Sequence, residues 1–102
     1  MTYSVVARDP ESGAFGVAVQ SHFFSTGAVV PWVEADVGAV ATQASAQINY
    51  GLMGLEQMRA RQSAEESLAS LVSADPGQAQ RQVAMVDRAG RAAAHTLSLI
   101  HI

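Results

Sequence analysis

The fold of this chain depends first on the stretch TYSVVARDPESGAFGVAVQS, residues 2–21. Both halves are rich in β-branched and apolar residues, which favour strands, and the connection Asp9-Pro10-Glu11-Ser12-Gly13 lies between them. Pro10 presets φ for a turn, and Gly13 can adopt the left-handed conformation that closes it. The stretch therefore predicts a β-hairpin that begins almost at the N-terminus and holds that terminus in place.

The length and composition are those of one globular domain. The chain has 102 residues, of which 49% are hydrophobic and 15% charged, against roughly 25% charged in typical soluble domains. Its formal net charge is −3, and all six basic residues are arginines that form no run. Because nucleic-acid binding requires a basic patch, we expect no nucleic-acid partner.

The residue types restrict the chemistry. The chain has no cysteine, which excludes disulfides, thiolate metal sites and cysteine nucleophiles, so a nucleophile must be Ser, Thr or a carboxylate. His22, His95 and His101 lack metal-ligand spacing, and we expect neither a metal nor another cofactor. The sequence has no signal-like segment and no apolar run of membrane-spanning length. We therefore expect a cytoplasmic protein with no membrane partner.

Further strands are predicted on both sides of a helical region. Residues 28–33 read as a strand interrupted by Pro31, which cannot donate to a β-ladder and is expected at a sheet edge. Residues 37–43 are small and β-branched, as in a strand covered on both faces. Residues 82–87 and 91–96 form a second hairpin, with Gly90 as its left-handed turn residue.

Between these strands the apolar period becomes helical. Leu52, Leu55 and Met58 predict a helix from about residue 50 to 61, which Gly54 allows to approach the sheet closely. The segment Ser63-Ala64-Glu65-Glu66 is a capping-box pattern. It predicts a second helix that begins at Ser63, ends before Pro76-Gly77 and buries Leu68, Leu71 and Val72. Four strands, two helices and two strands in this order predict an α+β fold with helices on one face of an antiparallel sheet.

Thr2 is the first candidate for chemistry. Removal of Met1 would place its hydroxyl beside a free α-amine, whose ordinary pKa of about 7.7–8.0 suits a general base. Ser4 projects to the same face of the strand, and Ser21 and His22 follow the arm that returns beside the terminus. The sequence thus gives Thr2, Ser4, Ser21 and His22 as candidate catalytic residues, although Thr at position 2 and a polar strand end are also common in ordinary proteins.

The second candidate stretch is TQASAQINYG, residues 42–51. It joins a buried strand to a helix, where backbone amides converge and can stabilise a developing oxyanion. Gln43, Asn49 and Tyr50 are the candidate substrate-binding residues. The alternatives are that Asn49 caps the helix and that Tyr50 packs in the core.

Taken together, the chain resembles an uncharacterised bacterial family of unknown function that is grouped with the N-terminal-nucleophile (Ntn) hydrolases. The matching blocks are MTYSVVARDP (1–10), GxFGVAVxS (13–21), GAVVPW (27–32), VGAVATQA (37–44), YGxxGL (50–55), DPG (75–77), RQV (81–83) and DxxGR (87–91).

The resemblance implies an Ntn-hydrolase-like αββα sandwich, here incomplete. Residues 1–96 would be the N-terminal part of one such domain, and residues 97–102 an unrelated or truncated tail. It also implies hydrolysis of a small-molecule or peptide-like amide, with Thr2 as nucleophile and oxyanion donors in the loop after Gln43; the fragment itself would be inactive. The alternatives are a non-catalytic ligand-binding or interaction domain, and a sheet fragment that forms homo-oligomers through an uncovered edge or face.

Overall fold

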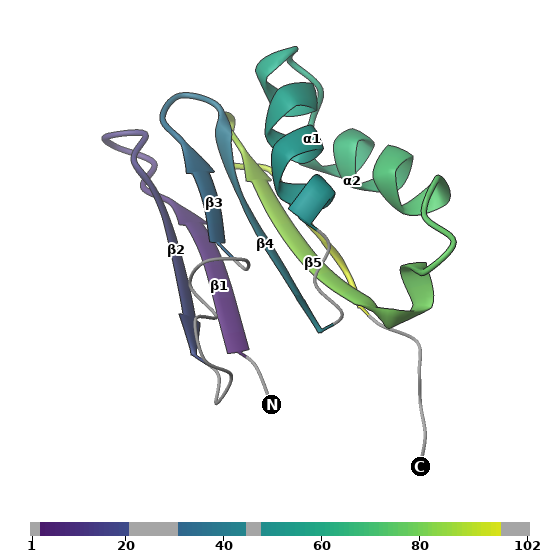
Figure 1. The fold of residues 1–102 in the computed structure, drawn as a ribbon. Helices are drawn as coiled ribbons and strands as arrows, with labels where there is room; N and C mark the ends of the chain where they lie inside the picture. Colours follow the sequence, from purple (N-terminus) through teal and green to yellow (C-terminus); the bar gives the residue numbers. More distant parts are fainter. Residues whose placement is uncertain (1–2, 21–30, 45–47, 97–102) are drawn as a thin grey trace.

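The chain folds into three layers, shown in Figure 1 as a two-stranded sheet, a four-stranded sheet and a pair of helices. The computed structural model describes residues 3–20, 31–44 and 48–96. The smaller sheet contains β1 (Tyr3–Arg8) and β2 (Phe15–Gln20), and the larger contains β3 (Pro31–Glu34), β4 (Gly38–Ala44), β5 (Arg81–Asp87) and β6 (Ala92–His95). The helices are α1 (Ile48–Arg59) and α2 (Ala64–Ser73). The α+β class and the order of strands and helices are thus confirmed.

The predicted N-terminal hairpin is present. β1 and β2 pair antiparallel from Tyr3 opposite Gln20 to Arg8 opposite Phe15. In the turn, the Asp9 carboxylate accepts hydrogen bonds from the Glu11 amide at 3.0 Å and the Ser12 hydroxyl at 2.9 Å. Gly13 has φ +77°, as the turn prediction requires.

One face of this hairpin lies on the larger sheet and the other is open. Its inward residues are half-buried: Ser4, Val6, Arg8, Phe15, Val17 and Val19. Its outward residues are exposed, with 57% of Val5 accessible. The hairpin contacts β3, β4 and β5 on the side of the larger sheet opposite the helices. An apolar outer face therefore remains uncovered in the described part of the chain.

The larger sheet follows the order β3-β4-β5-β6, with all neighbours antiparallel. β3 is at the edge, as Pro31 predicted, and Pro31 is its first described residue; residues 28–30 of the predicted strand lie outside the described residues. At that position its missing N–H breaks no ladder of the described strand. β4 is buried on both faces, since Ala39 and Val40 are each fully inaccessible, and this confirms the prediction for residues 37–43.

Helix α1 approaches the sheet through its glycines. A Cβ on Gly51 would lie 2.3 Å from Trp32 Cγ, and one on Gly54 would lie 2.9 Å from Met85 Cε. Leu52, one of the three residues that predicted this helix, is 53% exposed. Gly51 and Gly54 form the face of α1 that contacts the sheet, because only small residues fit so close to it. The large buried residues of α1 are Tyr50, Leu55 and Met58.

Helix α2 begins as predicted. Ser63 Oγ accepts from the Glu66 amide at 3.0 Å, and the Glu66 carboxylate accepts from the Ser63 amide at 3.0 Å, so the capping box is complete. Leu68 is buried, whereas Leu71 and Val72 are only half-buried. α2 therefore covers the sheet with its N-terminal half more fully than with its C-terminal half.

Asp87 connects this helix to the second hairpin. The Asp87 side chain is 2% exposed. Its Oδ2 atom accepts hydrogen bonds from the Ala64 amide at 2.9 Å and from Arg91 Nε at 3.0 Å. Its other oxygen accepts from the amides of Ala89 and Arg91, both at 3.0 Å. Gly90 has φ +85°, which confirms its predicted turn role. A buried carboxylate so fully hydrogen-bonded fixes the β5–β6 turn against the start of α2.

Candidate functional site

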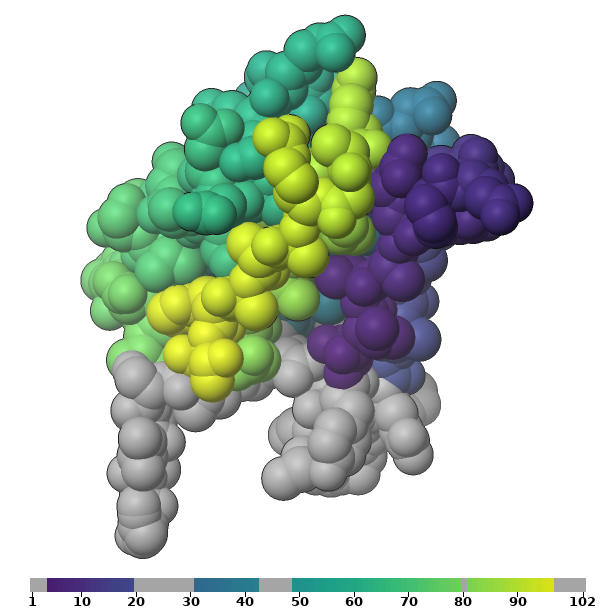
Figure 2. Space-filling model, turned by 180° about the vertical axis from the view of Figure 1, so that it is seen from behind, coloured from purple at the N-terminus to yellow at the C-terminus, as the bar shows by residue number. Residues whose placement is uncertain are grey.

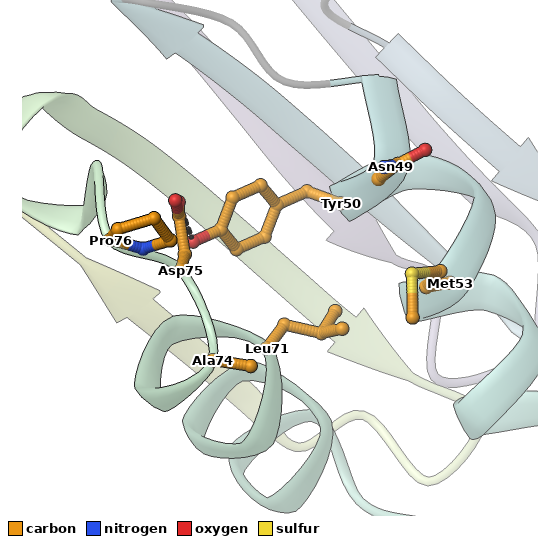
Figure 3. A pocket seen from close by; sticks show the side chains of 7 residues that line it. All are labelled: Asn49, Tyr50, Met53, Leu71, Ala74, Asp75 and Pro76. Carbon is orange, nitrogen blue, oxygen red and sulfur yellow. Dashed lines mark hydrogen bonds between the residues drawn. The ribbon is translucent and has the colours of Figure 1, made fainter.

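A pocket of about 280 Å³ opens between the first turn of α1 and the end of α2 (Figure 3). Two segments far apart in the sequence form it, because the packing of α1 on α2 brings the start of α1 beside the turn that follows α2. Its lining residues are Asn49, Tyr50, Met53, Leu71, Ala74, Asp75 and Pro76. Most of these side chains are apolar, which is typical of a pocket for a small organic molecule.

Tyr50 crosses from α1 to the opposite wall of the pocket (Figure 3). The residue is 2% exposed, and its hydroxyl donates to Asp75 Oδ2 at 2.6 Å. A buried tyrosine hydroxyl needs such a partner, because the lost hydration is otherwise uncompensated. Burial, and then the bond to the Asp75 carboxylate, raise the pKa of Tyr50 above its ordinary value.

Asp75 is held from three sides. Besides Tyr50, Arg81 Nε donates to the same carboxylate oxygen at 2.9 Å, and the Gly77 amide donates to Oδ1 at 2.8 Å. The side chains of Arg81 and Asp75 are only 17% and 12% exposed. Arg81 first, and then Tyr50, lower the pKa of Asp75 to about 2. Asp75 is therefore ionised at neutral pH.

This arrangement suits binding better than proton transfer. The Tyr50 hydroxyl donates its proton in a hydrogen bond to Asp75, and the negative charge of Asp75 forms an ion pair with Arg81. The pKa of Tyr50 is raised and that of Asp75 is lowered, whereas an efficient general base has a pKa near the operating pH. The pocket also offers the exposed Asn49 and an apolar wall from Met53 and Leu71.

The structure unites two of the predicted substrate-binding residues. Asn49 and Tyr50 both line the pocket. Asn49 is the second residue of α1, which begins at Ile48, so the alternative that it caps this helix is wrong. Gln43 lies in β4 opposite Gln82, at the end of a strand and not in the loop. Its side chain lies outside the described part of the structure.

Among the predicted catalytic residues, Ser4 lies in the described part of the chain, and it is away from this pocket. Ser4 is half-buried on the inner face of the hairpin, whereas the pocket is on the helical side of the larger sheet. The larger sheet therefore separates Ser4 from Tyr50. Thr2, Ser21 and His22 lie outside the described residues.

Asp75 and Arg81 were not among the predicted site residues. The sequence contains one signal for Asp75: the segment Asp75-Pro76-Gly77 is typical of a turn, and a tyrosine predicted to pack in the core requires a hydroxyl partner. Nothing in the local sequence connects Tyr50 with a residue 25 positions away. The packing of α1 on α2 creates that contact.

The chain has other properties that bear on function. Over residues 3–20, 31–44 and 48–96, neither helix has the length and apolar character needed to cross a membrane. Within the same ranges, no group of three or more His, Asp or Glu side chains is placed to hold a metal ion.

Comparison with known proteins gives a family and a solved relative. The model of a family described as "Family of unknown function (DUF1028)" matches residues 2–99. The crystal structure of protein SPO2555 from Silicibacter pomeroyi, assigned to the same family, matches with a TM-score of 0.91 and 34% sequence identity. The match covers 96% of this chain and 46% of SPO2555, so the chain spans about half the length of that relative. No curated protein matches the sequence.

Proposed function

The chain belongs to DUF1028, a family of unknown function, and from its resemblance to the N-terminal-nucleophile hydrolases we propose that it is part of an enzyme that hydrolyses amide bonds through Thr2. Met1 is first removed, so that Thr2 carries the free α-amine. The Thr2 hydroxyl oxygen attacks the carbonyl carbon of the amide while the α-amine takes the hydroxyl proton. The amine then delivers that proton to the leaving nitrogen as the C–N bond breaks, and water hydrolyses the resulting ester.

The observation that supports this proposal is the position of β1. The strand begins at Tyr3, the residue directly after Thr2, and Tyr3 is paired with Gln20 of β2. One residue further along, Ser4 and Val19 are paired and half-buried against the larger sheet. A nucleophile at Thr2 would therefore be attached to a strand that is fixed on one face by packing and along one edge by hydrogen bonds.

The layer order agrees with this proposal. An Ntn-type sandwich has two central sheets with helices outside each, and the described residues form helices on one side of two packed sheets. We propose that in the longer family members the remaining chain supplies the second helical layer, over the exposed outer face of the hairpin. Its substrate would be a small-molecule or peptide-like amide.

Covalent labelling tests the role of Thr2. Because the fragment alone is expected to be inactive, the full-length protein that contains this chain is incubated with an activated ester, and the acyl adduct is located by peptide mass spectrometry. The Thr2→Ala variant keeps a free α-amine but loses the hydroxyl, so it separates hydroxyl acylation from ordinary amine acylation. We expect the ester-linked adduct on the hydroxyl of residue 2 to be lost in Thr2→Ala, retained in Thr2→Ser and retained in Ser4→Ala. Equal labelling of wild type and Thr2→Ala would contradict the proposal.

A second candidate function is ligand binding without catalysis, in the pocket between α1 and α2. It is favoured by the hydrogen bonds that Tyr50 and Arg81 both donate to Asp75. These bonds fix a polar wall of the pocket beside its apolar side chains. Binding of a small aromatic amide at this pocket, unchanged in Thr2→Ala and weakened in Leu71→Gln, would support this function over hydrolysis.

A further inference from the structure

Two arginines line the same pocket, at the end of the molecule that contains the β1–β2 and β5–β6 turns. Arg8 is the last residue of β1, and Arg88 directly follows β5. Figure 2, which views the molecule from behind, shows the purple N-terminal hairpin beside the light-green end of β5. Both arginines line a pocket of about 320 Å³ together with Gly13, Phe15 and Asp36.

Both guanidinium groups have buried donors without partners. The Nε atoms of Arg8 and Arg88 are inaccessible to solvent and have no hydrogen-bond acceptor. In contrast, Arg59, Arg81 and Arg91 each form an ion pair with a carboxylate. A buried N–H on a charged group costs free energy when it has no acceptor. Each of the two arginines that line the pocket therefore keeps a buried donor without an acceptor in the described structure.

The guanidinium group of Arg8 lies between the turns that contain Gly13 and Gly90. A Cβ on Gly13 would lie 3.7 Å from one terminal nitrogen of Arg8, and a Cβ on Gly90 would lie 3.8 Å from the other. Both glycines have positive φ, so the guanidinium group lies between two turns whose backbone conformations favour glycine.

The local charge favours an anion. Two guanidinium groups line the pocket, and the one carboxylate among its lining residues is that of Asp36, which is exposed. The neighbouring carboxylate of Asp9 already accepts from Glu11 and Ser12. Guanidinium groups match the geometry of carboxylate and phosphate, because two parallel N–H groups can bind two oxygens.

We propose that Arg8 and Arg88 form a binding site for an oxyanion, a carboxylate or phosphate group on a small ligand, with Phe15 as its apolar wall. The site is at the opposite end of β1 from Tyr3, so it is independent of the hydrolysis proposed for Thr2. It is also separate from the pocket at Tyr50 and Asp75, which shares none of its lining residues.

Titration of the full chain with inorganic phosphate and, separately, with acetate tests this site. Chloride at the same ionic strength is the reference, and backbone amide shifts are followed by NMR. The variants are Arg8→Gln and Arg88→Gln, with Arg61→Gln as a control that removes an equal charge from an exposed position. The two anions distinguish a phosphate ligand from a carboxylate ligand.

We expect saturable shifts at the amides of Arg8, Gly13 and Arg88 with at least one anion. Each site variant should bind about tenfold more weakly, as for loss of a hydrogen bond to a charged group, while Arg61→Gln should bind like wild type. Shifts no larger than those in chloride, or shifts elsewhere on the molecule, would overturn the proposal. The mapping on wild-type protein decides this even if a site variant fails to fold.

Discussion

The hydroxyl oxygen of Tyr50 lies 2.6 Å from Oδ2 of Asp75, and this hydrogen bond joins the first turn of α1 to the turn after α2. Arg81, the first residue of β5, donates to the same carboxylate oxygen. One half-buried carboxylate therefore connects α1, the turn after α2 and β5. The network determines the shape of the adjacent pocket and gives it a pH dependence that can be measured.

Tyr50 should ionise later than an ordinary tyrosine. Burial and the bond to Asp75 raise its pKa, so the associated stability is present below pH 10 and is lost as pH rises through the higher, folded-state value. Absorbance at the phenolate wavelength should show one of the two tyrosines of the chain titrating only at strongly alkaline pH. The Tyr50→Phe variant should lack this late phase. Its persistence in Tyr50→Phe would show that Tyr50 is not the protected group.

Asp75 should make the protein sensitive to acid. Its pKa is lowered from 3.8 to about 2, so the unfolded chain takes up the proton first, and stability is lost as pH falls from about 4 to about 2. Asp75→Asn should be less stable than wild type at neutral pH but should lose less stability across this window. Urea denaturation at several pH values measures both effects. Parallel curves for the two proteins would contradict the assigned role.

Local sequence was sufficient to predict elements whose determinants lie within a few residues. The turn at Gly13, the turn at Gly90 and the capping box at Ser63 depend on φ preferences and on hydrogen bonds between near neighbours, and all were confirmed. The order of strands and helices also follows from local periodicity. These features can be predicted without knowing which helices and strands pack against each other.

Features that depend on packing between distant elements were not predicted. Leu52 fits a helical apolar pattern yet is exposed, because Gly51 and Gly54 take the face that contacts the sheet. The hydrogen-bond partner of the Tyr50 hydroxyl, Asp75, is 25 positions away in the sequence. The separation of Ser4 from Tyr50 by the larger sheet is likewise a property of layer order, which strand periodicity does not specify.

Alanine substitutions in α1 should separate packing from helix propensity. Gly51→Ala and Gly54→Ala gain the same helix propensity, about 1 kcal/mol. The new methyl at position 51 meets the Trp32 ring at 2.3 Å, whereas at position 54 it meets the flexible end of Met85 at 2.9 Å. We expect Gly51→Ala to lose about 1–3 kcal/mol of unfolding free energy and Gly54→Ala to remain within about 1 kcal/mol of wild type. Equal urea midpoints for the two variants would contradict this packing.

The open face of the hairpin should cause self-association. Val5 is 57% exposed on the outer face of a two-stranded sheet, while Leu52 is 53% exposed on a helix. Uncovered apolar strands promote pairing between copies, so light scattering should detect oligomers of the wild-type chain. Val5→Lys should reduce them and Leu52→Lys should not. A wild type that stays monomeric at high concentration, or equal effects of the two lysines, would argue against this surface.

The intact mass of the purified chain tests the proposed nucleophile most directly. The mechanism requires the α-amine and the hydroxyl on the same residue, so Met1 must be absent and Thr2 must be the first residue. We predict a mass for a chain that starts at Thr2, with N-terminal sequencing that reads Thr-Tyr-Ser. A mass that includes Met1 in the mature protein would contradict catalysis by Thr2.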